Sequence, residues 1–232
     1  MYTRILNLLY PQVCPFCGRI SEQGICSACK KKIIYVQEPR CMRCGKPLEK
    51  AEQEYCRDCA KHDAAYEQGR SVWVHREPVS GAIYRFKYGN KRNYGRIFAG
   101  EMAEHCGVQI RRWGVEEIIP IPLHPARKRK RGYNQAEILA EELGCLLHIP
   151  VRKDVLYRIR KTRPQKSLNG TERIRNLKGA FGVSGKETVK AKVLIVDDIY
   201  TTGSTIRRCA KMLRLAGAEK VYFLTISIGQ GL

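Results

Sequence analysis

Four cysteine pairs with C-x-x-C spacing lie within residues 14–59 and constrain this part of the chain more than any other feature. They hold eight of the eleven cysteines, namely Cys14, Cys17, Cys26, Cys29, Cys41, Cys44, Cys56 and Cys59. Such a pair lies on one tight turn, and two turns together supply the four thiolates of a tetrahedral zinc site. We predict two structural zinc ions. Because every ligand position is a cysteine, no open position remains for catalysis.

The spacing favours one pairing of these turns. The sequences "CPFCG…CSAC" and "CMRCG…CRDC" resemble one small ribbon repeated, so residues 14/17 pair with 26/29 and residues 41/44 with 56/59. An interleaved cross-brace is the alternative. A disulfide scaffold would require an oxidising compartment, which nothing in the sequence indicates. Each ribbon is too small to build a core, so the metal is expected to supply its folding free energy.

The sequence predicts a cytoplasmic chain without a membrane span. No apolar run approaches the roughly 18 residues that cross a bilayer. The apolar residues at 5–9 are not followed by a small-residue cleavage site, so they indicate a short amphipathic helix rather than a signal peptide.

The charge of the chain is strongly positive and unevenly distributed. The net charge is +21, and five consecutive cations occupy residues 127–131. A second basic stretch covers residues 152–178, which hold few acidic side chains. A positive field of this size favours a polyanionic partner, either a phosphorylated ligand or a nucleic acid.

The remaining sequence alternates strand and helix patterns, which predicts an α/β fold with a parallel sheet. We expect a boundary near residue 62, with residues 1–62 forming the N-terminal helix and double zinc ribbon and residues 63–232 the larger domain. Predicted strands cover 70–76, 151–157, 179–183, 192–197 and 220–228, and the stretch 115–124 begins as a short apolar strand and runs into a proline-marked loop. Predicted helices cover 78–89, 96–113, 134–149 and 203–218.

The stretch "VLIVDDIYTTGST", residues 193–205, has the composition of an anion site that follows a buried strand. Four apolar residues precede Asp197 and Asp198, where we expect the chain to leave the sheet. A turn then leads into a helix through Thr201, Thr202, Gly203, Ser204 and Thr205. Free backbone N–H groups and hydroxyls there can hold a phosphate. The two carboxylates would repel that phosphate unless a sugar diol lay between the acids and the phosphate. The carboxylates would then accept hydrogen bonds from the diol hydroxyls.

This stretch resembles the 5-phosphoribosyl-1-pyrophosphate (PRPP) motif of type I phosphoribosyltransferases at every position. The resemblance implies that the large domain has the parallel sheet of that family, with helices on both faces. In a transfer reaction, Asp197 and Asp198 would position the ribose and stabilise positive charge on it. Mg²⁺ would be held mainly by PRPP, with Asp197 as a further ligand.

Other motifs resemble the ComF family of late-competence and DNA-uptake proteins. They are the four cysteine pairs, "FKYGNKRNYG", "PIPLHPARKRKRGYNQ" and "RPQKSLNGTERIRNLKGAF". The resemblance covers nearly the whole chain. It implies a double zinc ribbon before a phosphoribosyltransferase-like domain, a role in handling single-stranded DNA during transformation, and a helicase-like competence partner.

The family fold also implies further contacts to PRPP. A pyrophosphate loop would fall on Leu123 and His124, with Arg131 just beyond it. An active-site loop would fall on residues 158–176, from which Arg163 would close over the ligand. The sequence shows no purine or pyrimidine pocket, so it does not identify the acceptor of a transfer reaction. The sequence therefore leaves open an active phosphoribosyltransferase with a nucleobase or amine acceptor outside DNA uptake, and a non-catalytic PRPP-sensing adaptor.

Overall fold

The computed structural model describes residues 11–159, 179–184 and 188–229. Its centre is a four-stranded parallel sheet in the order β1-β6-β5-β2. The strands are β1 (Gln68–Val74), β2 (Glu117–Pro120), β5 (Lys192–Tyr200) and β6 (Lys220–Ile228). A separate antiparallel pair joins β3 (Leu156–Arg158) to β4 (Phe181–Val183). The parallel sheet predicted from the alternating pattern is confirmed.

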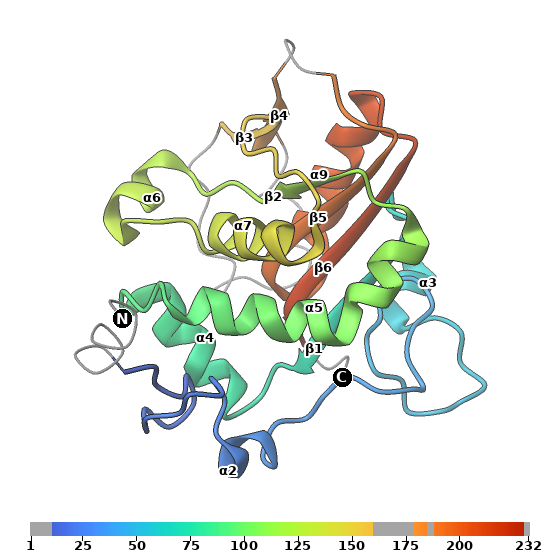
Figure 1. The fold of residues 1–232 in the computed structure, drawn as a ribbon. Helices are drawn as coiled ribbons and strands as arrows, with labels where there is room; N and C mark the ends of the chain where they lie inside the picture. The colour runs from blue at the N-terminus through green and yellow to red at the C-terminus, as the bar shows by residue number, and fades with distance from the viewer. Residues whose placement is uncertain (1–10, 160–178, 185–187, 230–232) are drawn as a thin grey trace.

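Helices cover both faces of the sheet (Figure 1). On one face lie α4 (Val79–Tyr88), α5 (Tyr94–Trp113) and α7 (Gln135–Leu147), and on the other lies α9 (Ser204–Leu215). Because side chains alternate along a strand, β5 serves both faces. Leu194 and Val196 face α5 and α7, whereas Val193 and Ile195 belong to the core under α9. Strand β5 is therefore apolar in sequence without a period of two.

The two cysteine-rich ribbons pack on opposite sides of the sheet. The first carries α2 (Ser27–Lys30), and Cys14 and Cys29 join the core that contains α4 and α5. The second carries α3 (Arg57–Lys61), and its four cysteines join the core that contains α9. The segment between the ribbons must consequently pass around the outer edge of β1.

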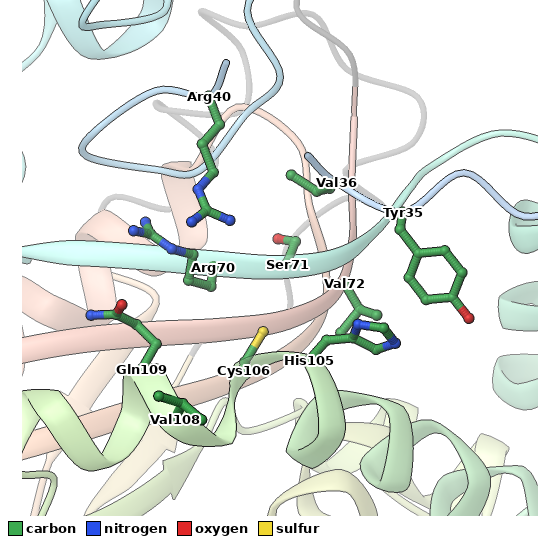
Figure 2. A pocket seen from close by; sticks show the side chains of 10 residues that line it. All are labelled: Tyr35, Val36, Arg40, Arg70, Ser71, Val72, His105, Cys106, Val108 and Gln109. Carbon is green, nitrogen blue, oxygen red and sulfur yellow. The ribbon is translucent and has the colours of Figure 1, made fainter. Parts of the chain in front are cut away.

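This linker between the ribbons pairs with the free edge of β1. Val36 N–H donates to Val72 O at 2.9 Å, and Val74 N–H donates to Ile34 O at 2.9 Å. The linker thereby covers part of this edge, which leaves less of it available to pair with a second chain. Beyond Val36 the linker departs from the strand, and a small pocket opens between it, β1 and α5 (Figure 2).

Several elements differ from the sequence-based expectation. Strand β5 continues to Tyr200 because Asp197, Ile199 and Tyr200 keep their register with β6. The basic run 127–131 belongs to a helix that was not predicted, α6 (Pro125–Arg131). Its signals were Pro125 at the first position and a histidine at the N-cap. Cys145, which lies on α7 and belongs to neither ribbon, is exposed.

Among the described helices, none combines the length and the apolar character needed to cross a bilayer. The N-terminal helix expected before residue 11 and most of the active-site loop expected at 158–176 lie outside the described residues. The boundary between residues 62 and 63 stays a prediction.

Candidate functional site: two four-cysteine centres and a cleft at the sheet edge

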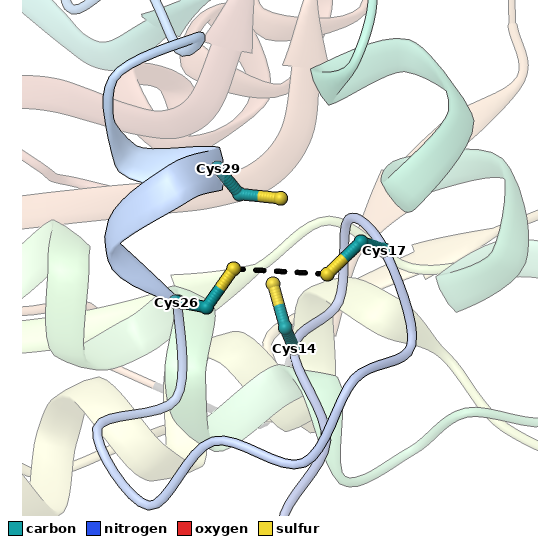
Figure 3. A group of neighbouring side chains, drawn as sticks. All are labelled: Cys14, Cys17, Cys26 and Cys29. Atoms are coloured by element: carbon teal, nitrogen blue, oxygen red, sulfur yellow. Dashed lines mark hydrogen bonds between the residues drawn. The ribbon is translucent and has the colours of Figure 1, made fainter.

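The eight ribbon cysteines form two separate clusters of four. One contains Cys14, Cys17, Cys26 and Cys29 (Figure 3), and the other contains Cys41, Cys44, Cys56 and Cys59. Within each cluster the sulfur atoms lie within 4.8 Å of one another. Consecutive C-x-x-C pairs therefore share a site, as the spacing favoured, and the interleaved arrangement is not formed.

The geometry of both clusters fits a structural zinc ion. A tetrahedral centre with Zn–S bonds of about 2.3 Å separates its sulfurs by about 3.8 Å. Cys17 Sγ lies 3.7 Å from Cys26 Sγ, and Cys44 Sγ lies 3.6 Å from Cys56 Sγ. Gly18 and Gly45 follow the first pair of each ribbon with φ of 76° and 73°. Glycine permits the left-handed turn that directs both thiolates to one point.

A cleft of about 940 Å³ lies where β2 and β5 reach the carboxyl edge of the sheet. Ligands of open α/β sheets bind at this edge, where strands give way to helices. All seven residues expected from the β5 motif line it: Asp197, Asp198, Thr201, Thr202, Gly203, Ser204 and Thr205. The structure therefore gathers the loop predicted to hold a phosphate and both acids around one space.

The two acids of the motif are held differently. Asp198 is only 8% exposed and pairs with Lys87 of α4, with 2.8 Å between Oδ1 and Nζ. Its N–H donates to Asp197 Oδ1 at 2.8 Å. Lys87 comes from a helix more than one hundred residues earlier in the chain. A ribose entering between the acids would meet one carboxylate already neutralised by a lysine.

Burial, followed by the charge of Asp198, raises the pKa of Asp197 to about 7, and Lys87 opposes this shift. Between an ordinary carboxyl pKa and about 7, the folded chain keeps a proton that the unfolded chain releases. The contribution of Asp197 to the free energy of unfolding therefore falls as pH rises through this window.

We expect Asp197→Asn to remove this pH dependence. The free energy of unfolding of the variant, relative to wild type, should rise by about 1 kcal/mol between about pH 6 and about pH 8. Urea unfolding of the ligand-free protein at several pH values measures this difference. Asp154→Asn is the matched control, because a hydrogen bond from Arg152 holds the pKa of Asp154 below its ordinary value. If the difference in free energy of unfolding between Asp197→Asn and wild type did not change with pH, the expectation would be contradicted.

The loop after β5 has the geometry of an anion cradle. Gly203 precedes α9 with φ of 71°, and a Cβ there would clash with the Tyr200 hydroxyl. Thr202 Oγ1 and Ser204 Oγ lie 2.8 Å apart. The loop thus places hydroxyls beside the free N–H groups at the start of α9, where a phosphate is stabilised.

Of the other predicted PRPP contacts, some line the cleft and others do not. Leu123 and Arg131 line the cleft. His124 is the N-cap of α6 instead: its Nδ1 accepts the Ala126 N–H at 3.2 Å, and it does not line the cleft. Arg163 lies outside the described residues. These roles in ligand binding stay predictions.

Comparisons with known proteins match two parts of the chain to family models. Residues 5–60 match the double zinc ribbon domain, and residues 129–227 match the phosphoribosyl transferase domain. Competence protein F of Haemophilus influenzae is 35% identical over 207 residues, covering 87% of this chain and 89% of the relative. The chain belongs to the ComF family.

Two further ComF-family relatives span a similar share of the chain. Competence protein ComFC of Streptococcus pneumoniae is 29% identical, over 88% of this chain and 87% of its own. DNA utilization protein YhgH of Escherichia coli K12 is 28% identical, over 92% of this chain and 96% of its own. The ComF-family chain is thus similar to these proteins across both ribbons and the phosphoribosyltransferase-like sheet.

Sequence reasoning missed several residues of the ComF-family cleft. Lys87, Tyr84 and Tyr88 line it from α4. The two tyrosines are 56% and 61% exposed, their ring centroids lie 4.9 Å apart, and Arg131 lies over the Tyr88 ring. In contrast, Phe86 of the same helix is buried in the core. The alternation of aromatic and basic residues was visible, but only the packing of α4 shows which side chains reach the cleft.

The second zinc centre of this ComF-family chain also contacts the β5 motif. Cys59 Sγ lies 4.0 Å from Tyr66 Oη, which lies 3.0 Å from Tyr200 Oη. Tyr200 stacks on Phe223 with ring planes 4° apart and supports the turn at Gly203. The second cysteine cluster therefore supports the end of β5 from which the loop at residues 201–205 begins.

Proposed function

We propose that this ComF-family protein binds PRPP with Mg²⁺ in the cleft and acts in the cytoplasm in DNA uptake during natural competence. The observation that carries the proposal is the joint placement of the acid pair and the Thr-Thr-Gly-Ser-Thr loop at one sheet edge. The 5′-phosphate would occupy the loop, and Asp197 and Asp198 would accept hydrogen bonds from the ribose hydroxyls.

The pyrophosphate of PRPP would lie toward the cations of α6. Arg127, Lys130 and Arg131 line the cleft from this helix. Carboxylate and phosphate oxygens are the ligands that Mg²⁺ prefers, and Asp197, which lines the cleft, would supply one. The metal would neutralise charge on the leaving group, while the acid pair holds the ribose and stabilises positive charge at its anomeric carbon.

Handling of single-stranded DNA is the second half of the proposal, with a helicase-like competence protein as partner. Its support is the net charge of +21, together with the exposed cations Lys128, Arg129 and Lys130 on α6, of which Lys130 lines the cleft. A cationic groove next to exposed aromatic rings is the usual means of binding single strands without sequence preference.

We expect salt-dependent binding to a single-stranded oligonucleotide, measured by fluorescence anisotropy. Arg129→Gln combined with Lys130→Gln should weaken binding and reduce the slope of log K against log salt by about one to two units. Lys31→Gln combined with Lys32→Gln changes two exposed cations of the first ribbon and should leave binding nearly unchanged. Equal effects of the two double substitutions would show that the DNA does not bind at α6. No binding of the oligonucleotide at low salt would exclude a role in handling single-stranded DNA.

An active phosphoribosyltransferase is the second candidate function. The exposed Tyr84–Tyr88 pair at the cleft favours it, because an aromatic platform can stack the ring of a nucleobase acceptor. Pyrophosphate release from PRPP, measured across a panel of bases and amines, tests this activity. Tight PRPP binding without release for any acceptor would favour a PRPP-sensing adaptor instead.

A further inference from the structure

A second pocket, of about 230 Å³, lies far from the β5 motif on the outer edge of the sheet. Three parts of the chain line it: the linker between the ribbons, β1 and α5 (Figure 2). None of its lining residues also lines the PRPP cleft. The pocket opens between two anchors of the linker, the Val36 N–H bond to Val72 O and the Gly69 N–H bond to Arg43 O.

Two arginines from different segments face this pocket. Arg40 reaches toward β1 from the linker, and Arg70 projects from β1 itself (Figure 2). Arg70 Nη1 donates to Gly69 O at 2.9 Å, but its buried Nε has no hydrogen-bond partner among the described residues. Burial, followed by the charge of Arg40, holds the pKa of Arg70 below its ordinary value. Two guanidinium groups placed together in this way destabilise each other unless an anion joins them.

The nearby acidic side chains do not fill this role. None of the described residues that line the pocket is acidic. Glu38 lies 2.8 Å from Arg40 Nε and also attracts the charge of Arg70, but its side chain is 69% exposed to solvent. Glu101 is held at the far end, where it accepts a hydrogen bond from Tyr35 Oη at 2.9 Å. Among the described residues, Arg70 therefore forms no ion pair with a carboxylate.

We propose that this pocket binds a phosphate group between Arg40 and Arg70. Planar guanidinium groups bind phosphate oxygens in pairs, which a lysine cannot do. The volume is below the roughly 300 Å³ at which pockets for larger organic ligands begin, so a compact oxyanion fits. The side chain of Gln109 on α5 lines the same space and offers amide donors.

The bound phosphate would join two parts of the molecule. Arg40 directly precedes Cys41, a ligand of the second zinc centre, whereas Arg70 belongs to the central sheet. A phosphate between them fastens the second ribbon to β1. Free inorganic phosphate and a phosphate of a nucleic-acid backbone have the same chemistry here, and either can be the source.

The test is calorimetric titration of inorganic phosphate into the full-length, zinc-loaded protein carrying Thr202→Glu. The added carboxylate repels phosphate from the PRPP cleft, so the outcome does not depend on PRPP binding there. In this background, Arg70→Gln should weaken phosphate binding at least about tenfold. Arg112→Gln removes an exposed cation of α5 that does not line the pocket, and should change the affinity less than about twofold.

Zinc content and circular dichroism verify that each variant is folded, and Arg40→Gln and Gln109→Ala provide independent tests if Arg70→Gln is not. A parallel titration with a short single-stranded oligonucleotide separates the sources. Weaker oligonucleotide binding in Arg70→Gln assigns the site to the nucleic-acid backbone. An effect on phosphate alone assigns it to the free ion, and either result supports the site. Equal phosphate affinity of Arg70→Gln and Arg112→Gln would overturn the proposal. So would the absence of phosphate binding to the Thr202→Glu protein that keeps Arg40 and Arg70.

Discussion

Replacement of Cys44 by serine is expected to release one zinc ion and to unfold the second ribbon. Cys44 is fully buried and lies 3.6 Å from Cys56 within the cluster. Structural zinc contributes about 10 kcal/mol or more to the folding of small ribbons, which is comparable to the whole stability of a domain. Zinc content should fall from about two to about one ion per chain, as measured by chelator release.

The effect of Cys44→Ser should extend to the PRPP cleft. Tyr66 links the second centre to Tyr200, which supports the turn at Gly203. Loss of the ribbon exposes this contact and is expected to lower the melting temperature and the affinity for PRPP together. Cys145→Ser is the control, since Cys145 is exposed and belongs to neither cluster. A Cys44→Ser protein that keeps both zinc ions would show that Cys44 is not a required zinc ligand.

Asp198→Asn should weaken PRPP binding about tenfold to a hundredfold. The amide keeps an acceptor oxygen but loses the charge that strengthens its hydrogen bonds to ribose hydroxyls, which are worth about 1.5–3 kcal/mol each. The substitution also leaves Lys87 without its ion-pair partner at 2.8 Å. Calorimetry with PRPP and Mg²⁺ on both proteins measures the loss.

Asp154→Asn supplies the control for this experiment. Asp154 has an exposed side chain, pairs with Arg152 and does not line the cleft. It removes the same charge from the chain and should leave PRPP affinity within about twofold of wild type. Equal affinity of Asp198→Asn and wild type for PRPP would contradict the assigned pose. Absence of PRPP binding to wild type would contradict the proposed function.

Local patterns predicted the parts of the molecule that contiguous residues build. The C-x-x-C spacing predicted two four-cysteine clusters and their pairing, because each turn needs only four residues to aim two thiolates. The run 193–205 predicted a buried strand, an acid pair and a loop before a helix. The missed helix α6 had local signals too, but its run of cations obscured them.

Contacts between distant segments could not be predicted in the same way. Lys87 reaches Asp198 only because α4 packs at the carboxyl edge of the sheet. The aromatic strip of that helix divides between core and cleft according to how α4 is rotated, which its composition does not specify. His124 was expected beside PRPP, yet its imidazole caps α6.

The sequence by itself determined the chemical groups of each site: eight thiolates suited to zinc, and two acids with a hydroxyl-rich loop suited to a sugar phosphate. Spacings of a few residues encode these features, so they are readable without a fold. Only the tertiary structure decided that the ribbons pack on opposite faces, that Tyr66 touches Tyr200, and that Arg40 faces Arg70. The physical reason is that burial of apolar faces positions whole elements, and the polar contacts between them follow from that packing.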